Sequence, residues 1–287
     1  MSTDAIARPA TTTTRARRFQ RRFLFYIPLV AMLFFYLIPV YVLLVTSLKS
    51  FDQVSLSTMW HLPRGLAFDN FRAAYDKLAP NLWNSVMLVI PGAIISAFLG
   101  SLNGYILAKW KFPGADIIFP LILFGMFIPY QSVLIPLVQF MRASGLYGGI
   151  PGLVLVHVIY GLPITTLTFR NYFAGIPGEL VEAARIDGAG LVGVYWRIFL
   201  PLAIPAFVVV LIWQFTSIWN DFLFAVVLTG GQSWPITVAL NNIAGSQIVA
   251  WNVQMAGALL AALPPLLVYI VLGRYFLRGM MAGALKG

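Results

Sequence analysis

The sequence predicts an all-α membrane protein with six transmembrane helices. Of its 287 residues, 60% are hydrophobic and 10% are charged, whereas a soluble domain carries about a quarter charged residues. Uninterrupted apolar stretches recur along the chain, and about 20 apolar residues in a helix suffice to cross a bilayer. Basic residues gather beside alternate stretches, which is the pattern that orients a polytopic membrane protein.

The predicted spans follow these apolar stretches in chain order, within a transmembrane domain of residues 23–275. They cover residues 23–48, 82–108, 117–141, 150–169, 201–229 and 253–273. Residues 1–22 are polar, Thr-rich and basic, which predicts a disordered cytoplasmic tail, and residues 276–287 form a second, basic and glycine-rich tail. The first apolar stretch lacks a short signal-peptide core and an evident cleavage site, so we expect it to be retained.

Several spans carry glycine or proline at positions that affect packing. Gly100 and Gly104 in the second span have the spacing that permits close helix packing. Before that span, Asp69 is expected to cap a separate short helix. The third span contains Pro120, Pro129 and Pro136. We therefore expect it to be kinked or broken, with Tyr130 and Gln131 beside the central break.

The uncharged segment 230–252 is ambiguous. Its apolar part, residues 236–249, has 14 residues and is too short to span. The segment is predicted to be an external loop or a re-entrant segment.

The positive charges test the six-span topology. With both termini in the cytoplasm, 14 of the 19 Lys and Arg residues lie inside and five lie outside. This bias predicts a cytoplasmic N-terminus, a cytoplasmic C-terminus and a cytoplasmic segment 170–200.

That cytoplasmic segment holds the most distinctive stretch of the chain. Glu182, Arg185, Asp187 and Arg197 prevent residues 182–201 from crossing a bilayer. A short helix is expected with negative charge in its first turn, ending where Gly188 adopts a left-handed conformation. A second short helix follows. One face of the first helix is expected to present Leu180, Ala183, Ala184 and Asp187 to a partner.

The stretch resembles the "EAA" signature of ABC importer permeases. The matching residues are Glu182, Ala183, Ala184, Gly188, Ile198, Leu200 and Pro201. The resemblance implies the type I ABC importer permease fold, with cytoplasmic coupling helices that dock on an ATP-hydrolysing subunit. In that role Glu182 and Asp187 make polar contacts, and Gly188 permits the elbow.

Further residues resemble the maltose-type, sugar-importing branch of this family. They are Asn84-Ser85, the run from Lys111 to Gly114, Trp219-Asn220-Asp221 and Lys286-Gly287. The C-terminal part from Asn252 is similar to permeases for glucose or mannose. The resemblance implies a multi-pass protein of a prokaryotic plasma (inner) membrane.

The resemblance also implies partner proteins, and the sequence indicates which ligands this chain does not bind itself. A second homologous permease, two ABC ATPase subunits and a periplasmic or lipid-anchored sugar-binding protein are expected. The chain has no GxxxxGK[ST] loop, so ATP and Mg²⁺ are expected on the partner ATPase, with no cofactor and no catalytic or metal site in this chain. Because the positive charge accompanies apolar spans, it points to membrane lipid and not to nucleic acid.

The candidate substrate pathway centres on Asp221 in the fifth predicted span. Gln214, Ser217 and Asp221 lie at i, i+3 and i+7 and so share a helix face, with Trp219 and Asn220 beside them. Gln131 completes the candidate set. An aromatic ring beside hydrogen-bonding groups suits a sugar. The alternative is that Asp221 only ties two helices together, and His157 is expected to be a helix–helix hydrogen-bond donor.

Two other classes of function remain to be weighed. A stand-alone channel or ion-gradient-driven secondary transporter would call for intramembrane carboxylate relays, which are scarce here. A membrane scaffold would not need the polar stripe. An enzyme is not expected.

Overall fold

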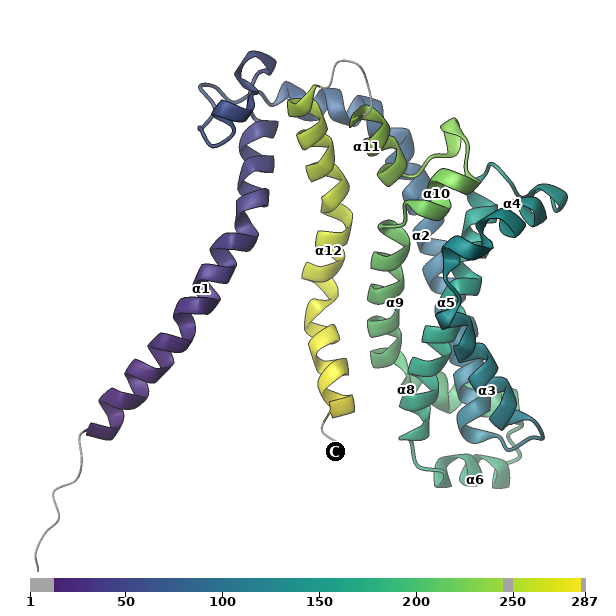
Figure 1. Ribbon diagram of the computed structural model, residues 1–287. Helices are drawn as coiled ribbons and strands as arrows, with labels where there is room; N and C mark the ends of the chain where they lie inside the picture. The colour runs from purple at the N-terminus through teal and green to yellow at the C-terminus, as the bar shows by residue number, and fades with distance from the viewer. Residues whose placement is uncertain (1–12, 245–249, 285–287) are drawn as a thin grey trace, which may run out of the picture.

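The computed structural model describes residues 13–244 and 250–284 and is helical throughout its regular structure. Four helices are individually long and apolar enough to cross a membrane, and they carry spans at Phe25–Ser47, Asp69–Lys109, Ile150–Ala174 and Trp251–Tyr275. Two bent helix pairs bring the number of candidate spans up to six if each pair counts as one span. The predicted all-α membrane fold is therefore confirmed. In Figure 1 most of the long helices run side by side in a bundle, while the N-terminal helix slants away from them.

The first and last helices extend beyond the predicted spans. Helix α1 (Thr13–Ser47) begins inside the predicted disordered tail, so that prediction is wrong for residues 13–22, while residues 1–12 lie outside the described part of the chain. Likewise α12 (Trp251–Ala284) continues through most of the predicted C-terminal tail. The N-terminal boundary carries no glycine or proline that would stop a helix, whereas α12 continues through Gly273 and Gly279.

Helix α2 (Asp69–Lys109) corrects the prediction of a short helix followed by a separate span. It is one helix of 41 residues that contains Pro80 and Pro91. Its length of about 60 Å is twice the thickness of the hydrocarbon core. Asp69 is its first residue and makes no capping hydrogen bond through its side chain. The N-terminal part packs against α11 and α12 at one end of the bundle (Figure 1).

The third predicted span is broken, as its prolines indicated. Helix α3 (Ala115–Phe124) and the 3-10 turn η3 (Gly125–Phe127) precede Pro129, and η4 (Tyr130–Val133) and α4 (Leu134–Ala143) follow it. The two parts meet at an angle of 91°. Proline at the break lacks the N–H that a continuous helix requires. Helix α5 (Ile150–Ala174) then returns as the fourth span, five residues longer than predicted.

The fifth predicted span, residues 201–229, is divided into three helices. Helix α8 (Leu200–Leu202) is followed by α9 (Ile204–Trp219) and, after a break at residues 220–222, by α10 (Leu223–Leu228). Because the helix ends at Trp219, residues on either side of Asn220 do not continue one helical face.

The segment between α10 and α12 lies at the end of the bundle. It contains the 3-10 turn η6 (Gly231–Ser233) and α11 (Ile236–Ala244), and residues 245–249 lie outside the described part. With nine residues, α11 is too short to span, in agreement with the prediction. Ile236 and Val238 are buried against the bundle.

Two hydrophobic clusters stabilise the bundle at different levels. One lies between α2, α5, α9 and α10 and includes Leu88, Leu153, Trp219 and Leu228. The other lies toward the opposite end and includes the buried rings of Tyr105, Phe169, Phe173, Tyr195 and Phe199. At the level of the second cluster, α2 and α5 approach closely at Gly100 and Gly104, which confirms the packing role predicted for these glycines.

The outer ends of the first and last helices lie at the same end of the bundle as the segment predicted to be cytoplasmic. In Figure 1 the start of α1, the end of α12 and α6 (Glu179–Ile186) are all found at the lower end. The loop after α1, with η1 (Phe51–Gln53) and η2 (Leu56–Thr58), lies at the upper end together with α11. An even number of crossings, as predicted, produces this arrangement.

Candidate functional site

The elbow, residues 179–199, is two short helices joined by a left-handed glycine. Helix α6 ends at Ile186, and α7 (Leu191–Val194) leads into the π-helix η5 (Tyr195–Phe199). Gly188 has φ of +78°, which glycine adopts without the steric cost that a Cβ brings. Its N–H donates to Arg185 O over 3.0 Å, and Ala189 N–H donates to Ala184 O over 2.8 Å. These bonds close the C-terminus of α6, as the sequence predicted.

Helix α6 presents a mixed face to solvent. Glu182, Ala183 and Asp187 are exposed, and Ile186 is 86% exposed at the tip. In contrast, Val181 and Ala184 are buried against the bundle. The predicted contact face is therefore wrong in one respect, because Ala184 points inward while its neighbour Ala183 points outward.

The remaining residues of the signature form the joint between the elbow and the bundle. Ile198 and Leu200 are half-buried and pack against the lower aromatic cluster. Pro201 lies in the first turn of α8, where its fixed φ and missing N–H are tolerated. Glu179 occupies the first turn of α6, where a carboxylate is favourable at the positive end of the helix dipole.

The polar stripe predicted along span five is interrupted by the end of α9. Gln214 is 3% exposed and its Nε2 donates to Ser96 Oγ on α2. Ser217 and Asn220 are exposed, and Asn220 Nδ2 donates back to Thr216 O over 2.9 Å. Gln131 is exposed in η4.

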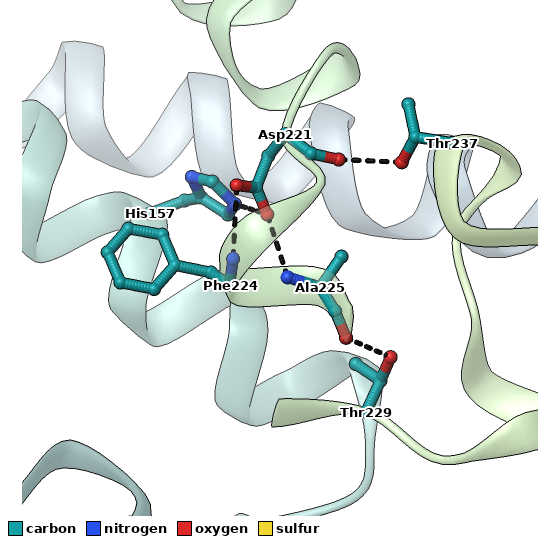
Figure 2. Close-up of polar contacts among 6 residues, drawn as sticks. All are labelled: His157, Asp221, Phe224, Ala225, Thr229 and Thr237. Carbon is teal, nitrogen blue, oxygen red and sulfur yellow. Dashed lines mark hydrogen bonds and ion pairs between the residues drawn. The ribbon is translucent and has the colours of Figure 1, made fainter. Parts of the chain in front are cut away.

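Asp221 lies in the break between α9 and α10 and joins three segments (Figure 2). Its carboxylate accepts hydrogen bonds from Phe224 N at 3.3 Å and Ala225 N at 2.9 Å, in the first turn of α10. His157 Nε2 of α5 lies 3.3 Å from the carboxylate. The Asp221 carbonyl accepts a bond of 2.6 Å from Thr237 Oγ1 on α11. His157 thus makes the hydrogen-bonded contact between segments that was predicted for it. The partners of Asp221 favour the alternative in which this residue ties helices together.

The ring of Trp219 is buried within the bundle and is not accessible to a ligand. The indole is 3% exposed, stacks on Phe215 with ring centroids 5.6 Å apart, and donates from Nε1 to Ala261 O on α12 over 3.1 Å. The exposed aromatic side chain of α9 is Trp213, at 57%, which the sequence reasoning missed. Its spacing of four and seven residues from Ser217 and Asn220 could have indicated it, because such residues share a helix face.

A shallow open pocket lies between α5 and α9 beside Trp213. Its lining residues are Ile164, Thr165, Thr168, Val209, Val210, Trp213 and Gln214. Of the predicted pathway residues, only Gln214 reaches it.

Comparison with known proteins relates most of the chain to one family. Residues 100–281 match the model of the binding-protein-dependent transport system inner membrane component. A probable ABC transporter permease protein of Pyrococcus horikoshii is 48% identical over 93% of this chain and 98% of its own length. The xylose/arabinose import permease protein XacI of Haloferax volcanii is 35% identical over 92% of this chain and 93% of its own.

The fold is shared with a solved structure. A permease chain of a bacterial ABC transporter involved in the import of the acidic polysaccharide alginate aligns with a TM-score of 0.78 and 23% identity, covering 94% of this chain and all of that one. The helical bundle thus has the fold of a type I ABC importer permease. The chain belongs to the family of binding-protein-dependent transport system inner membrane components, the ABC importer permeases.

Proposed function

We propose that this chain, with a second permease, carries a sugar across a prokaryotic plasma membrane, driven by ATP hydrolysis on partner ATPase subunits. The observation that carries this proposal is the elbow, a two-helix projection at one end of the bundle. Its outer face combines the exposed Ile186 with the carboxylates of Glu182 and Asp187. An exposed apolar tip beside charged groups suits a protein partner.

The sugar substrate is inferred from relatives. The Haloferax relative is named for xylose and arabinose import, and the sequence resembles the sugar-importing branch of the family. A pentose or hexose delivered by an external binding protein is therefore the proposed substrate, with glucose and mannose among the candidates. ATP and Mg²⁺ are assigned to the partner ATPase.

The proposed partner permease would cover surfaces that this chain leaves open. In the apolar windows of α1 and α12, only 11% of residues are buried within the chain. Lipid and a second permease together would cover such faces, because apolar side chains are stable against either. The exposed face of α9, with Trp213, Ser217 and Asn220, is the proposed surface along which the sugar passes.

The first experiment is purification of the complex from its native membrane, followed by uptake in proteoliposomes. Retained ATPase subunits, a retained binding protein and uptake that requires ATP are expected. The sugars to compare are glucose, mannose, xylose, arabinose and maltose. Uptake driven by an ion gradient without ATP would contradict the proposal in favour of a secondary transporter.

A variant links this function to the elbow. Glu182→Ala removes one exposed carboxylate from α6 without disturbing any span. We expect normal amounts in the membrane but weaker retention of the ATPase subunit and slower uptake. Asn220→Ala, which leaves the elbow intact, is expected to retain the ATPase fully.

A further inference from the structure

Both halves of the elbow contact the C-terminal end of α2, which is distant from the elbow in the sequence. Helix α5 leads into the elbow and α8 leads out of it. Yet the elbow side chains meet the last turns of α2, about 80 residues earlier in the chain. These contacts lie at the lower end of the bundle, beside the proposed docking face of α6 (Figure 1).

The first half of the elbow is held by Trp110, the residue that follows α2. The guanidinium carbon of Arg185, in the last turn of α6, lies 4.3 Å from the centre of the Trp110 ring. That distance is within the range of a favourable cation–π interaction. The indole is itself half-buried and lies edge-on to Tyr105, with ring centroids 6.3 Å apart.

The second half of the elbow is held by Tyr105. This side chain is completely buried, and its hydroxyl donates a 3.0 Å hydrogen bond to the carbonyl of Leu191, the first residue of α7. Its ring centroid lies 4.8 Å from Phe199 and 5.3 Å from Tyr195 in η5. Tyr105 of α2 thus contacts both the start of α7 and the π-helix that follows it.

A third contact also joins the second half of the elbow to α2. Tyr195 Oη and Ser101 Oγ share a buried hydrogen bond of 3.1 Å. Ser101 and Tyr105 are four residues apart and so lie on one face of α2. The contacts to the second half of the elbow are therefore a continuous strip along α2.

Helix α2 is in turn fixed to α5. A Cβ at Gly104 would lie 2.6 Å from Arg170 N, and one at Gly100 would lie 2.1 Å from Thr165 Oγ1. Helices that pack backbone against backbone in this way leave little room for sliding. The elbow, α2 and α5 are accordingly joined pairwise.

We infer that Tyr105 and Trp110 are positioning residues for coupling, which hold the elbow to α2 so that these two elements move together when the ATPase acts. The inference rests on the proposed function and extends it, because Tyr105 and Trp110 lie outside the signature stretch of the elbow. The elbow then transmits displacement to α2, in addition to the two helices to which it is covalently linked.

Tyr105→Phe tests the inference with a minimal change. It removes one hydroxyl and its bond to Leu191 while retaining the buried ring. The matched control is Tyr172→Phe, because Tyr172 Oη also donates to a carbonyl, that of Leu202 at 2.7 Å, but links α5 to α8 and not to α2. The measurement is sugar taken up per ATP hydrolysed by the complete importer in proteoliposomes.

We expect Tyr105→Phe to retain its ATPase subunits but to lower uptake per ATP roughly two- to tenfold, the effect of losing about one net hydrogen bond. Tyr172→Phe is expected to match the unaltered importer. Equal coupling in the two variants would overturn the inference and leave the proposed function intact. An unaltered importer without ATP-dependent uptake would overturn both.

A cross-link provides an independent test that does not depend on Tyr105. The chain contains no cysteine, so the pair Trp110→Cys and Arg185→Cys can be joined selectively by a short bis-thiosulfonate reagent. We expect the unlinked pair to lose coupling and the reagent to restore it at least partly. Uptake that is lost on cross-linking and regained on reduction would show that the elbow must move relative to α2, and would overturn the inference.

Discussion

At the residue scale, Asp221 shows how one side chain can cap the start of a helix and link that helix to its neighbours. Its carboxylate accepts two backbone N–H groups of α10 and faces His157 of α5. The first N–H groups of a helix have no partner within the helix, so the carboxylate stabilises the start of α10. The same group satisfies His157 in a largely buried setting.

Asp221→Ala is expected to destabilise the permease by about 1–3 kcal/mol, because it leaves buried N–H groups and an imidazole without an acceptor. The measurement is thermal unfolding of the purified protein in detergent. Asp221→Asn, which keeps an acceptor oxygen, should lose less. Asn220→Ala, on the exposed side of the same turn, is the control.

A stable Asp221→Ala variant with impaired uptake would instead support a role for Asp221 in the substrate pathway. Normal stability with normal uptake would contradict both roles.

Gly188→Val is expected to perturb the elbow alone. A side chain at φ of +78° costs about 1–2 kcal/mol in backbone energy, and more for a β-branched residue. No atom lies within 4 Å of the added Cβ, so the cost is purely conformational. We expect normal membrane abundance, as insertion depends on the spans, but reduced ATPase retention and uptake.

Gly190→Val is the matched control for Gly188→Val. Gly190 also has nothing within 4 Å of an added Cβ, but its φ is −76°, which any residue adopts. Full retention of the ATPase by both variants would sink the elbow model.

At the scale of elements, the pairing of α2 with α5 supports both the bundle and the elbow. The two helices meet through glycines on α2 and through Thr165 and Phe169 on α5. Buried Ser96 adds a carbonyl that accepts from Thr165 Oγ1 over 3.2 Å. Small residues permit the close approach, and the polar bonds fix the register.

Gly104→Ala is expected to force these helices apart. Its Cβ would meet backbone atoms of α5 at 2.6 Å and 2.9 Å, which cannot move independently. Overpacking of this kind costs about 1–3 kcal/mol, measured as a lower unfolding temperature in detergent. Gly193→Ala is the control, because its nearest neighbour is at an ordinary 3.8 Å, and comparable losses in both variants would contradict the close-packing argument.

Helix breaks were predictable only where the local sequence encodes them. Pro129 and Gly188 indicated a broken span and an elbow, and both are present. The end of α9 at Trp219 carries no proline or glycine, and Asp221, two residues later, is held by His157 and Thr237, which are distant in sequence. Pro80 and Pro91, in contrast, lie within a continuous α2, because neighbouring groups in a bundle can satisfy the freed carbonyls.

The candidate site was predictable to the same extent. The coupling residues form a contiguous signature, so their sequence alone located the elbow. The burial of Trp219 requires Ala261 on α12 and Phe215 beside it, and periodicity cannot reveal which side of α9 faces another helix. The exposed ring of Trp213 was missed although its spacing of four residues from Ser217 places the two side chains on one face of α9.

At the scale of the whole molecule, the two ends of the bundle are held by different chemistry. The upper end is held by amides: Asn70 Nδ2 donates to the carbonyls of Ser47 and Lys49, each at 2.8 Å, and Asn252 Nδ2 donates to Asn70 Oδ1 at 2.9 Å. These bonds tie α1, α2 and α12 together. The lower end is held by aromatic rings around the elbow.

The orientation of these two ends in the membrane is the last prediction. The start of α1, the end of α12 and the elbow share one end, and the loop after α1 lies at the other (Figure 1). In the predicted topology, 14 of the 19 basic residues lie on the cytoplasmic side, which favours that orientation.

Single cysteines in this cysteine-free chain, at exposed Ala183 and at exposed Arg64, provide the measurement. In intact cells, a membrane-impermeant maleimide should label the Arg64→Cys variant and spare Ala183→Cys until the cells are lysed. A reporter fused after Gly287 should be cytoplasmic, because six crossings return the chain to its starting side. An external reporter would require an odd number of crossings, and would make the segment around α11 a true span in spite of its length.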